Sequence, residues 1–330
     1  MQIRIYGLIF LICAIASSLA GADKKRPQPG EGEKLSLPVF YYEVGTYPML
    51  SRDSVKVILK TKVPFDALQF IKKKNVFSAR YELSILIIDE NKNKSASKIW
   101  VQSLKTESFQ ETNSQQLFDI NEVSFRLVPG KYSSTIAVLD LDNKKKNIQK
   151  GIIEIGHFYK KPITISNIDI IEQEFTNEKG EIDDISSIEG TVNDTKPEFI
   201  VSFNILSDGG PAIITYKIFT TNNKEILSNT VIDTLTSGIN NKRLIIDRKN
   251  LGYSKYKISV AVEMDEWKVA NDRIFQLRWF GMSKLIDDLD VAIDQIKYIA
   301  SGKDIKKIKK AGPKEKKEKF VRFWKQLDPS

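Results

Sequence analysis

The reactive side chains of this chain set narrow limits on its chemistry. His157 is the only histidine and Cys13 the only cysteine among 330 residues. A Ser-His-Asp triad would have to use His157, and a zinc site built on paired histidines cannot form. No nucleophile elbow, phosphate-binding loop, HExxH motif or dinucleotide fingerprint occurs. We expect a structural role for His157, at the end of a strand, and predict no catalytic residue, metal ligand or cofactor.

Clustered acids near the C-terminal end are the next candidates. A calcium site would draw on Asp287, Asp288, Asp290 and Asp294. Calcium needs several converging oxygens, usually from a loop that contains glycine, and no such loop pattern is present. We therefore interpret these acids as a solvated helix face, and Asp140-Leu141-Asp142-Asn143 as a hairpin turn.

Positive charge is concentrated in the same region. The net charge of the chain is +9, and residues 301–325 hold eleven Lys or Arg against three acids. Clustered lysines attract anionic surfaces, so candidate contacts with lipid head groups or acidic polysaccharide are Lys303, Lys306, Lys307, Lys309 and Lys310. The alternative, which we favour, is that these lysines keep a helical tail soluble. Aromatic residues are not interleaved among the lysines from 303 to 317, so we expect no nucleic-acid partner.

The first 22 residues resemble a secretory signal peptide. Arg4 supplies the positive start, a short apolar run follows at 7–15, and small residues at 20–22 suit a signal peptidase. An uncleaved membrane anchor and a lipid-modified Cys13 are the alternatives. The run is short for a bilayer core of about 30 Å, so we favour cleavage.

Export follows from that interpretation. We expect a periplasmic or extracellular protein in which residues 23–35, polar and rich in Pro and Gly, form a flexible leader. No later stretch is long and apolar enough to span a membrane. An exported chain without disulfides must rely on hydrophobic cores of substantial size.

Two sets of short strands follow the leader. Runs such as 81–88 and 123–127, and later 199–206 and 255–262, are rich in β-branched and aromatic residues and are separated by turn residues. We predict a mainly β protein with two immunoglobulin-like β-sandwich domains, at 36–160 and 161–280, followed by a short α-helical segment at 281–330.

A similar sequence pattern occurs once in each of the two predicted domains. Gly130-Lys131-Tyr132 precedes one strand, and Gly252 and Tyr256 precede another, with the two tyrosines 124 residues apart. In immunoglobulin-like sandwiches a tyrosine at such a turn can bond back to the backbone and fix the corner between the sheets. We predict this role for Tyr132 and Tyr256, although glycine and tyrosine before a strand are also common without it.

The tail changes to helical spacing. One apolar face would comprise Leu285, Ile286, Leu289, Ala292, Ile293 and Ile296. Ser283 is the expected N-cap of this first helix and Gly302 its C-cap. Further helices are predicted at 304–311 and 314–327. On the last of them, candidate apolar residues facing a partner are Phe320, Phe323 and Trp324.

The order of residues in the tail resembles the opening of the GWxTD domain. The resemblance rests on Tyr298-Ile299-Ala300, a basic linker with Gly312-Pro313, the run Phe320-Val321-Arg322-Phe323-Trp324, and Asp328-Pro329. It covers about fifty residues, and the Gly-Trp-x-Thr-Asp motif itself is absent. Bacterial proteins of this family are exported and often carry β-rich segments ahead of the domain. The resemblance implies no catalytic residues.

Three hypotheses of function remain. The first is an exported, non-enzymatic protein with a structural or protein-interaction role in the cell envelope, whose partners are proteins or envelope components. The second is a glycan- or peptide-binding module, for which Trp100 beside Phe40 and Tyr42 would be the contact. The third is a hydrolase that uses two carboxylates converging in a cleft. Oligomeric state is left open.

Overall fold

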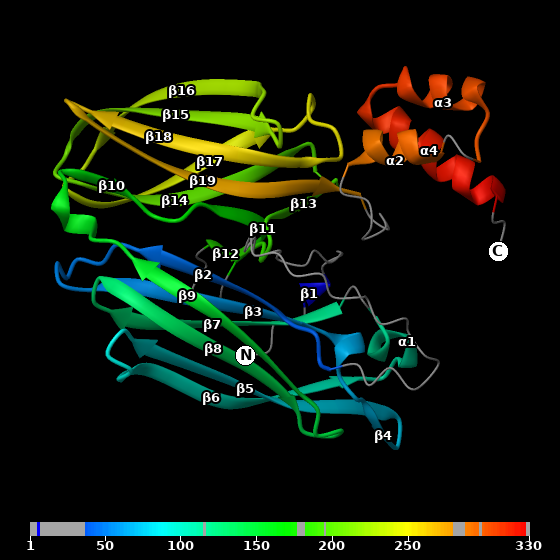
Figure 1. Cartoon of the computed structure of the whole chain (residues 1–330), viewed down its shortest axis with the longest axis horizontal. Coiled ribbons are helices and arrows are strands. Elements are labelled where there is room, and N and C mark those ends of the chain that lie inside the picture. Colours follow the sequence, from blue (N-terminus) through cyan, green and yellow to red (C-terminus); the bar gives the residue numbers. More distant parts are fainter. Residues whose placement is uncertain are drawn as a thin grey trace, which may run out of the picture.

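The computed structural model describes residues 5–6, 37–114, 117–176, 182–194, 196–279, 288–296 and 299–327. The predicted signal peptide and leader lie outside these ranges, apart from the two residues of β1 (Ile5–Tyr6), which pair with β7. The prediction of a mainly β chain that ends in short helices is confirmed. Figure 1 shows two layered β units, one above the other, with the helices beside one end of the second.

The first unit is a sandwich of two sheets. One sheet has the order β1-β7-β3-β2, and its longer strands are β2 (Tyr41–Tyr47), β3 (Val55–Pro64) and β7 (Leu117–Leu127). The other places β5 between β6 and β8, and comprises β4 (Ile71–Lys73), β5 (Val76–Asp89), β6 (Lys94–Thr106), β8 (Gly130–Asp140) and β9 (Lys146–Ile155). The short helical turns are η1 (Phe65–Ala67), α1 (Phe109–Thr112) and η2 (Phe158–Lys160).

Period-two alternation builds the first core. On β5 the buried side chains are Ala79, Tyr81, Leu83, Ile85 and Ile87, while the residues between them are more exposed. They pack against the alternating residues of β3, among them Val57 and Leu59. Successive side chains of a strand point to opposite faces, so this spacing turns one face of each sheet inward.

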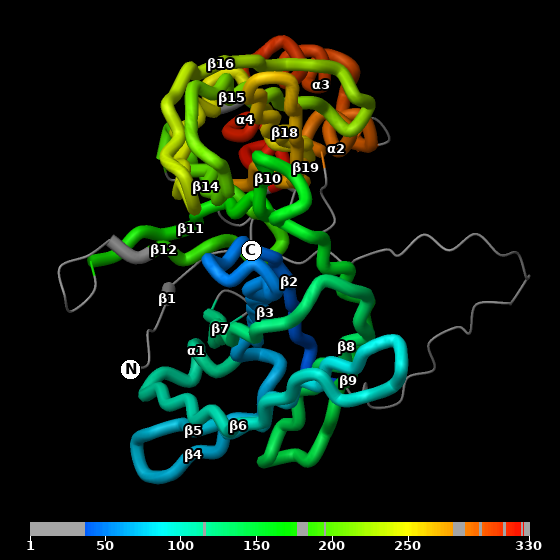
Figure 2. The backbone as a smooth tube through the Cα atoms, turned by 90° about the vertical axis from the view of Figure 1, so that its left-hand side faces the viewer, coloured from blue at the N-terminus to red at the C-terminus, as the bar shows by residue number. Residues whose placement is uncertain are grey.

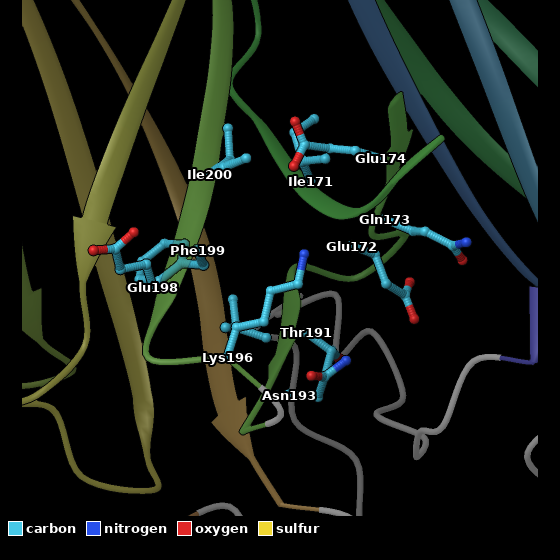
Figure 3. A pocket seen from close by; sticks show the side chains of 11 residues that line it. Ile171, Glu172, Gln173, Glu174, Thr191, Asn193, Lys196, Glu198, Phe199 and Ile200 are labelled. Carbon is cyan, nitrogen blue, oxygen red and sulfur yellow. The ribbon is translucent and has the colours of Figure 1, made fainter. Parts of the chain in front are cut away.

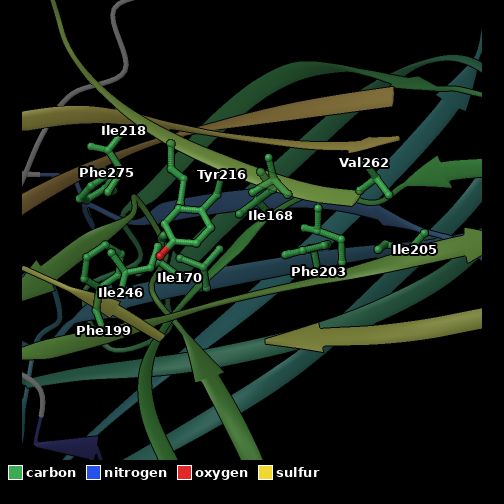
Figure 4. Close-up of a cluster of buried hydrophobic side chains, with 14 of the residues drawn as sticks. Ile168, Ile170, Phe199, Phe203, Ile205, Tyr216, Ile218, Ile246, Val262 and Phe275 are labelled. Carbon is green, nitrogen blue, oxygen red and sulfur yellow. The ribbon is translucent and has the colours of Figure 1, made fainter. Parts of the chain in front are cut away.

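The second unit is also a sandwich. One sheet has the order β10-β14-β11-β12, with β17 on the other side of β14; its strands are β10 (Ile163–Ile165), β11 (Asp169–Thr176), β12 (Ile182–Ser186), β14 (Glu198–Ser207) and β17 (Gly238–Asp247). The other has the order β13-β19-β18-β15-β16, with β13 (Thr191–Asn193), β15 (Gly210–Thr220), β16 (Glu225–Leu235), β18 (Lys255–Met264) and β19 (Trp267–Arg278). Figure 4 shows its core, where Phe199 and Ile246 face Tyr216 and Phe275.

The two sandwiches repeat one arrangement. The orders β2-β3-β7 and β6-β5-β8-β9 in the first correspond to β11-β14-β17 and β16-β15-β18-β19 in the second. The predicted corners are confirmed in both. The hydroxyl of Tyr132, at the start of β8, donates to the carbonyl oxygen of Val128 at 2.9 Å. That of Tyr256, at the start of β18, donates to the carbonyl oxygen of Gly252 at 3.0 Å.

Three helices end the described chain: α2 (Leu289–Gln295), α3 (Gly302–Lys309) and α4 (Pro313–Leu327). Ser283 lies outside the described residues, and Asp288 is the N-cap of α2, where its carboxylate accepts from the amides of Asp290 and Val291. The prediction that Gly302 caps a helix C-terminus is wrong. Gly302 begins α3, because the side chain of Ser301 accepts from the amide of Asp304 and starts a new helix there.

Candidate interaction surfaces and the junction between the sandwiches

Charged side chains join the two sandwiches. Arg273 on β19 reaches across to Glu43 on β2, and its two terminal nitrogens each contact one carboxylate oxygen, with Nη2 to Oε2 at 2.6 Å. The side chains of Arg273 and Glu43 are only 15% and 18% exposed. A forked arginine–carboxylate pair fixes orientation as well as distance, so this contact limits how the sandwiches can rotate against each other.

A second set of contacts lies beside the first. Lys60 Nζ on β3 lies 2.9 Å from Asp169 Oδ1 on β11, and the hydroxyl of Tyr47 donates to Asp169 Oδ2 at 2.7 Å. Burial and the neighbouring Asp169 carboxylate raise the pKa of Tyr47 far above its ordinary value, so its hydroxyl remains a donor. Asn167 Oδ1 also accepts from the amide of Thr46 at 2.7 Å. Several polar groups therefore hold the junction together.

One pocket of the second sandwich is small. It lies among β11, β13 and β14, where Figure 3 shows Glu172, Lys196 and Phe199 around it, and has a volume of about 60 Å³. Burial raises the pKa of Glu172, although Lys62 opposes that shift. Pockets for organic ligands usually measure ~300 Å³ or more. This pocket has room only for a few water molecules.

A hollow of about 370 Å³ lies beside α1, at the end of β6. Its lining is Val76, Lys105, Thr106, Glu107, Ser108 and Glu111. Only Val76 is apolar, whereas ligand sites are lined mainly by apolar and aromatic side chains. The hydroxyl of Thr106 also donates to Glu111, so these two polar groups of the lining already bond to each other.

The aromatic residues considered for glycan binding do not form an exposed cluster. Phe40 is 1% exposed and belongs to the first core. Tyr42 and Trp100 are partly buried and pack against that core, and Trp100 Nε1 lies 3.3 Å from Asn121 Oδ1 as a donor. The indole is therefore held within the sandwich.

Asn121 belongs to a buried polar group in the first sandwich. The hydroxyl of Tyr81 donates to Asp119 Oδ2 at 2.5 Å, and Asn121 Nδ2 donates to that hydroxyl at 2.8 Å. Burial and the Asp119 carboxylate raise the pKa of Tyr81 well above its ordinary value. Burial also raises the pKa of Asp119, although its bonds with Tyr81 and Asn121 oppose the shift.

Asp119→Asn is expected to change the pH dependence of stability. The folded state holds the proton of Asp119 more readily than the unfolded chain, so this residue lowers the free energy of unfolding as the pH rises from its ordinary pKa of 3.8 through the raised one. Asparagine cannot ionise, so the variant will gain stability relative to wild type across that window. Urea unfolding at a series of pH values measures the difference. If the free energy of unfolding changes with pH in the same way in both proteins, the raised pKa of Asp119 is contradicted.

Most of the remaining candidates for chemistry take part in turns or ion pairs. His157 is exposed, and its side chain makes no capping bond at η2. Asp140 Oδ1 accepts from the amides of Asp142 and Asn143, which confirms the hairpin turn. Asp290 and Asp294 pair with Lys316 and Lys309, and Asp287 lies outside the described residues. Within the described ranges, no three His, Cys, Asp or Glu side chains gather as metal ligands.

The aromatic residues of α4 divide between the inside and the surface. Phe320 is 4% exposed and lies edge-on to Trp279, which follows β19 and is 3% exposed. Trp279 also packs edge-on against Tyr253, with 4.9 Å between ring centroids. Phe323 is partly buried at the rim of this cluster, whereas Trp324 is 44% exposed. Phe320 therefore joins the tail to the second sandwich. Of the three residues predicted to face a partner, Trp324 is the most exposed to solvent.

Further contacts hold the helices against the second sandwich. The amide of Leu289 donates to the carbonyl oxygen of Tyr253 at 3.0 Å, and Ser254 donates to Asp288. Lys317 Nζ lies 2.6 Å from Asp194 Oδ2, which also accepts from the hydroxyl of Tyr253 at 2.9 Å. In the described part of the chain, no helix has the length and apolar character needed to cross a membrane.

Four of the five candidate lysines form a stripe along α3. Lys303, Lys306, Lys307 and Lys310 are exposed and spaced at i, i+3, i+4 and i+7 on one helix face. Ile305 and Ile308 lie on the opposite face and pack into the cluster around Trp279. The fifth lysine, Lys309, lies off the stripe and pairs with Asp294. None of the four forms an ion pair with a described acid.

Sequence reasoning missed the residues of the junction. Glu43 and Arg273 are 230 positions apart and lie in different strands, and a single charge in a strand has no spacing that marks its partner. Trp279 was also missed. Its signal was an aromatic pair, Trp279-Phe280, directly after a strand and before a helical tail.

Comparisons with known proteins find no matching family model and no matching curated protein. Dimeric latent PorU from Porphyromonas gingivalis aligns with 76% of this chain and 21% of its own, at 11% identity and a TM-score of 0.31. A β-glucuronidase from Parabacteroides merdae aligns with 74% of this chain and 30% of its own, at 9% identity and a TM-score of 0.25. Trypsin-activated α-2-macroglobulin from Escherichia coli aligns with 74% of this chain and 17% of its own, at 9% identity and a TM-score of 0.25. The chain thus spans less than a third of each of these proteins.

Proposed function

We propose that this is an exported, non-enzymatic protein of the cell envelope in which two sandwiches form a rigid spacer for the C-terminal helices. The junction supports the rigid spacer, and the proposal of export rests on the signal-like residues 1–22. Glu43, Tyr47 and Lys60 of the first sandwich bond to Asp169 and Arg273 of the second through largely buried side chains. Interfaces between domains usually allow motion unless they are large and apolar, so the proposed rigidity rests on the directional bonds of these largely buried side chains.

The attachment of the tail supports the same role. Trp279, Tyr253 and Phe320 bring three helices against one end of the second sandwich. The helices would then be presented to protein or envelope partners in a defined orientation, with Trp324 available for contact. The resemblance of the tail to the start of a GWxTD domain stays a prediction; Tyr298 and Asp328-Pro329, which carry part of it, lie outside the described residues.

The alternatives have less support. A glycan-binding surface would need exposed aromatics, whereas Phe40 is in the core and Trp100 is held by Asn121. A hydrolase would need two carboxylates in a cleft large enough for its substrate, and the pocket that contains Glu172 and Glu174 measures about 60 Å³.

Two measurements test the proposed function. With Cys13 replaced by serine, spin labels at Lys98→Cys on β6 and Lys307→Cys on α3 will give one narrow distance distribution, because the sandwiches and helices are held as one body. A broad distribution would contradict the rigid spacer.

Cell fractionation will find the protein outside the cytoplasm, and an unprocessed cytoplasmic product would contradict export.

The lysine stripe favours a second candidate function, which is contact with an anionic surface. Four like charges on one helix face repel one another, whereas other lysines of the tail have acid partners. A polyanion would relieve this repulsion, and its effect would weaken with salt.

Changing Lys303, Lys306, Lys307 and Lys310 to glutamine is therefore expected to abolish binding to vesicles rich in anionic lipid, or to an acidic polysaccharide, at low salt. Co-sedimentation with each probe distinguishes the two. The control changes Lys94, Lys98, Lys146 and Lys150 of the first sandwich, which removes the same net charge. Equal loss in the two variants would show that only the total charge matters.

A further inference from the structure

The edge strand β16 is unusually open. It ends the order β13-β19-β18-β15-β16 and, among the described strands, pairs only with β15. Figure 1 shows it along the outer rim of the second sandwich. Three of its apolar side chains are exposed: Ile226 to 38%, Val231 to 40% and Ile232 to 80%. Exposed edge strands of this kind present free backbone groups to another strand.

The other described edge strands of ten or more residues, β6, β9 and β17, carry the usual protection against such pairing. Lysine or arginine interrupts β6 at Lys98, β9 at Lys150, and β17 at Lys242 and Arg243. The eleven residues of β16, Glu-Ile-Leu-Ser-Asn-Thr-Val-Ile-Asp-Thr-Leu, contain no Lys, Arg or Pro. Natural sheets use these residues to block edge-to-edge association, so their absence makes β16 receptive.

Local hydrogen bonds reveal which residues of β16 face outward. The amide of Thr230 donates to Asn229 Oδ1, and that of Thr234 donates to Asp233 Oδ1, both at 2.8 Å. These amides therefore do not bond to β15. In an antiparallel ladder alternate residues bond to the same neighbour, so the even-numbered residues of β16 present their backbone groups to the open edge. The two side-chain contacts are exposed, and a new strand could replace them.

We propose that a second copy of this chain pairs with β16, antiparallel and around a two-fold axis at Val231. In this register Val231 meets its own copy, Leu227 lies opposite Leu235, and Asn229 lies opposite Asp233. These three pairings match apolar with apolar residues and an amide with the only acid within the pairing, while Ile232 lies opposite Thr230. The same strand serves on both subunits, as two-fold symmetry requires.

Two other registers place the acids of β16 less favourably. A two-fold axis at Thr230 would place Asp233 against Leu227 and Glu225 against Leu235. An axis at Asn229 would place Glu225 directly opposite Asp233, and like charges in that position are destabilising. In the Val231 register Glu225 lies beyond the paired strands, and both acids keep their lysine partners, Lys217 and Lys242.

Sedimentation of the full chain tests the dimer. The wild-type protein will show a mass that rises from monomer to dimer with concentration. Val231→Lys places two like charges together and will raise the dimer dissociation constant by about tenfold or more, which corresponds to ~1.4 kcal/mol per tenfold. Ile99→Lys on β6, also at an exposed edge-strand position, will leave it unchanged. A monomer at every concentration, or a dimer insensitive to Val231→Lys, would overturn the proposal.

Cross-linking tests the register. Val231 would form a non-hydrogen-bonded pair with its copy, with Cα atoms ~4.5 Å apart, within the range that a disulfide requires. In a background with Cys13→Ser, Val231→Cys will form a covalent dimer on mild oxidation, and Thr230→Cys will do so far more slowly. Faster cross-linking at Thr230 would place the axis elsewhere and overturn the proposed pairing.

Discussion

Arg273→Met is expected to destabilise the junction between the sandwiches by about 3–5 kcal/mol, because it leaves the carboxylate of Glu43 largely buried without its partner. Both side chains are less than one-fifth exposed, so solvent can compensate only weakly. Equilibrium unfolding in urea measures the loss, and the label distance between β6 and α3 will broaden. Lys217→Met, which breaks the exposed Lys217–Glu225 pair, will change stability by less than ~1 kcal/mol.

A double variant separates the charge from the packing. Adding Glu43→Gln to Arg273→Met removes the uncompensated carboxylate and will restore part of the lost stability. If the single variant loses no more than Lys217→Met, or if the second change adds a further loss, the ion pair does not hold the junction.

Trp279→Ala is expected to release the helical tail while both sandwiches stay folded. Truncating a buried tryptophan typically lowers the free energy of unfolding by about 3–5 kcal/mol. The ring of Trp279 contacts Tyr253 of the second sandwich and Phe320 of the tail, so it links the two. Hydrogen exchange will accelerate throughout α2, α3 and α4, whereas the core strands β14 and β18 will stay protected. Trp324→Ala, at an exposed position on α4, will leave the exchange of α2 and α3 near wild type.

Two outcomes would contradict this role for Trp279. Unfolding of the second sandwich would mean that the indole supports the sandwich core and not only the docked tail. Unchanged protection of the helices would mean that the polar contacts of Asp194 and Asp288 are enough to hold them.

Local patterns predicted much of the fold. Alternation fixes which side chains of β5 face inward, because the period of two is a property of any strand. The corners at Tyr132 and Tyr256 were predictable because the tyrosine, its turn and the following strand lie within a few residues of one another. The helical tail was predictable from its change of period.

Contacts between distant segments could not be predicted in the same way. The pairing of Glu43 with Arg273 depends on how two complete sandwiches meet, which no local pattern records. Phe320 was expected to face a partner because its spacing defines only an apolar face, and the surface that covers it is set by Trp279. The start of α3 was missed because glycine suits a helix C-terminus, while Ser301 provides a stronger local N-cap.

Arg273 lies on β19, and Trp279 directly follows the end of this strand. They are six positions apart, or about 20 Å of extended chain. A mechanical load applied to the tail would enter the body at Trp279, pass along β19 and reach the first sandwich through Arg273 and Glu43. Along this path β19 is paired with β18 up to Gln276 and with β13 from Gln276 to Arg278, so the load would act in shear on both ladders. Tension on the helices would thus be borne by the strand ladder before any loop is stretched.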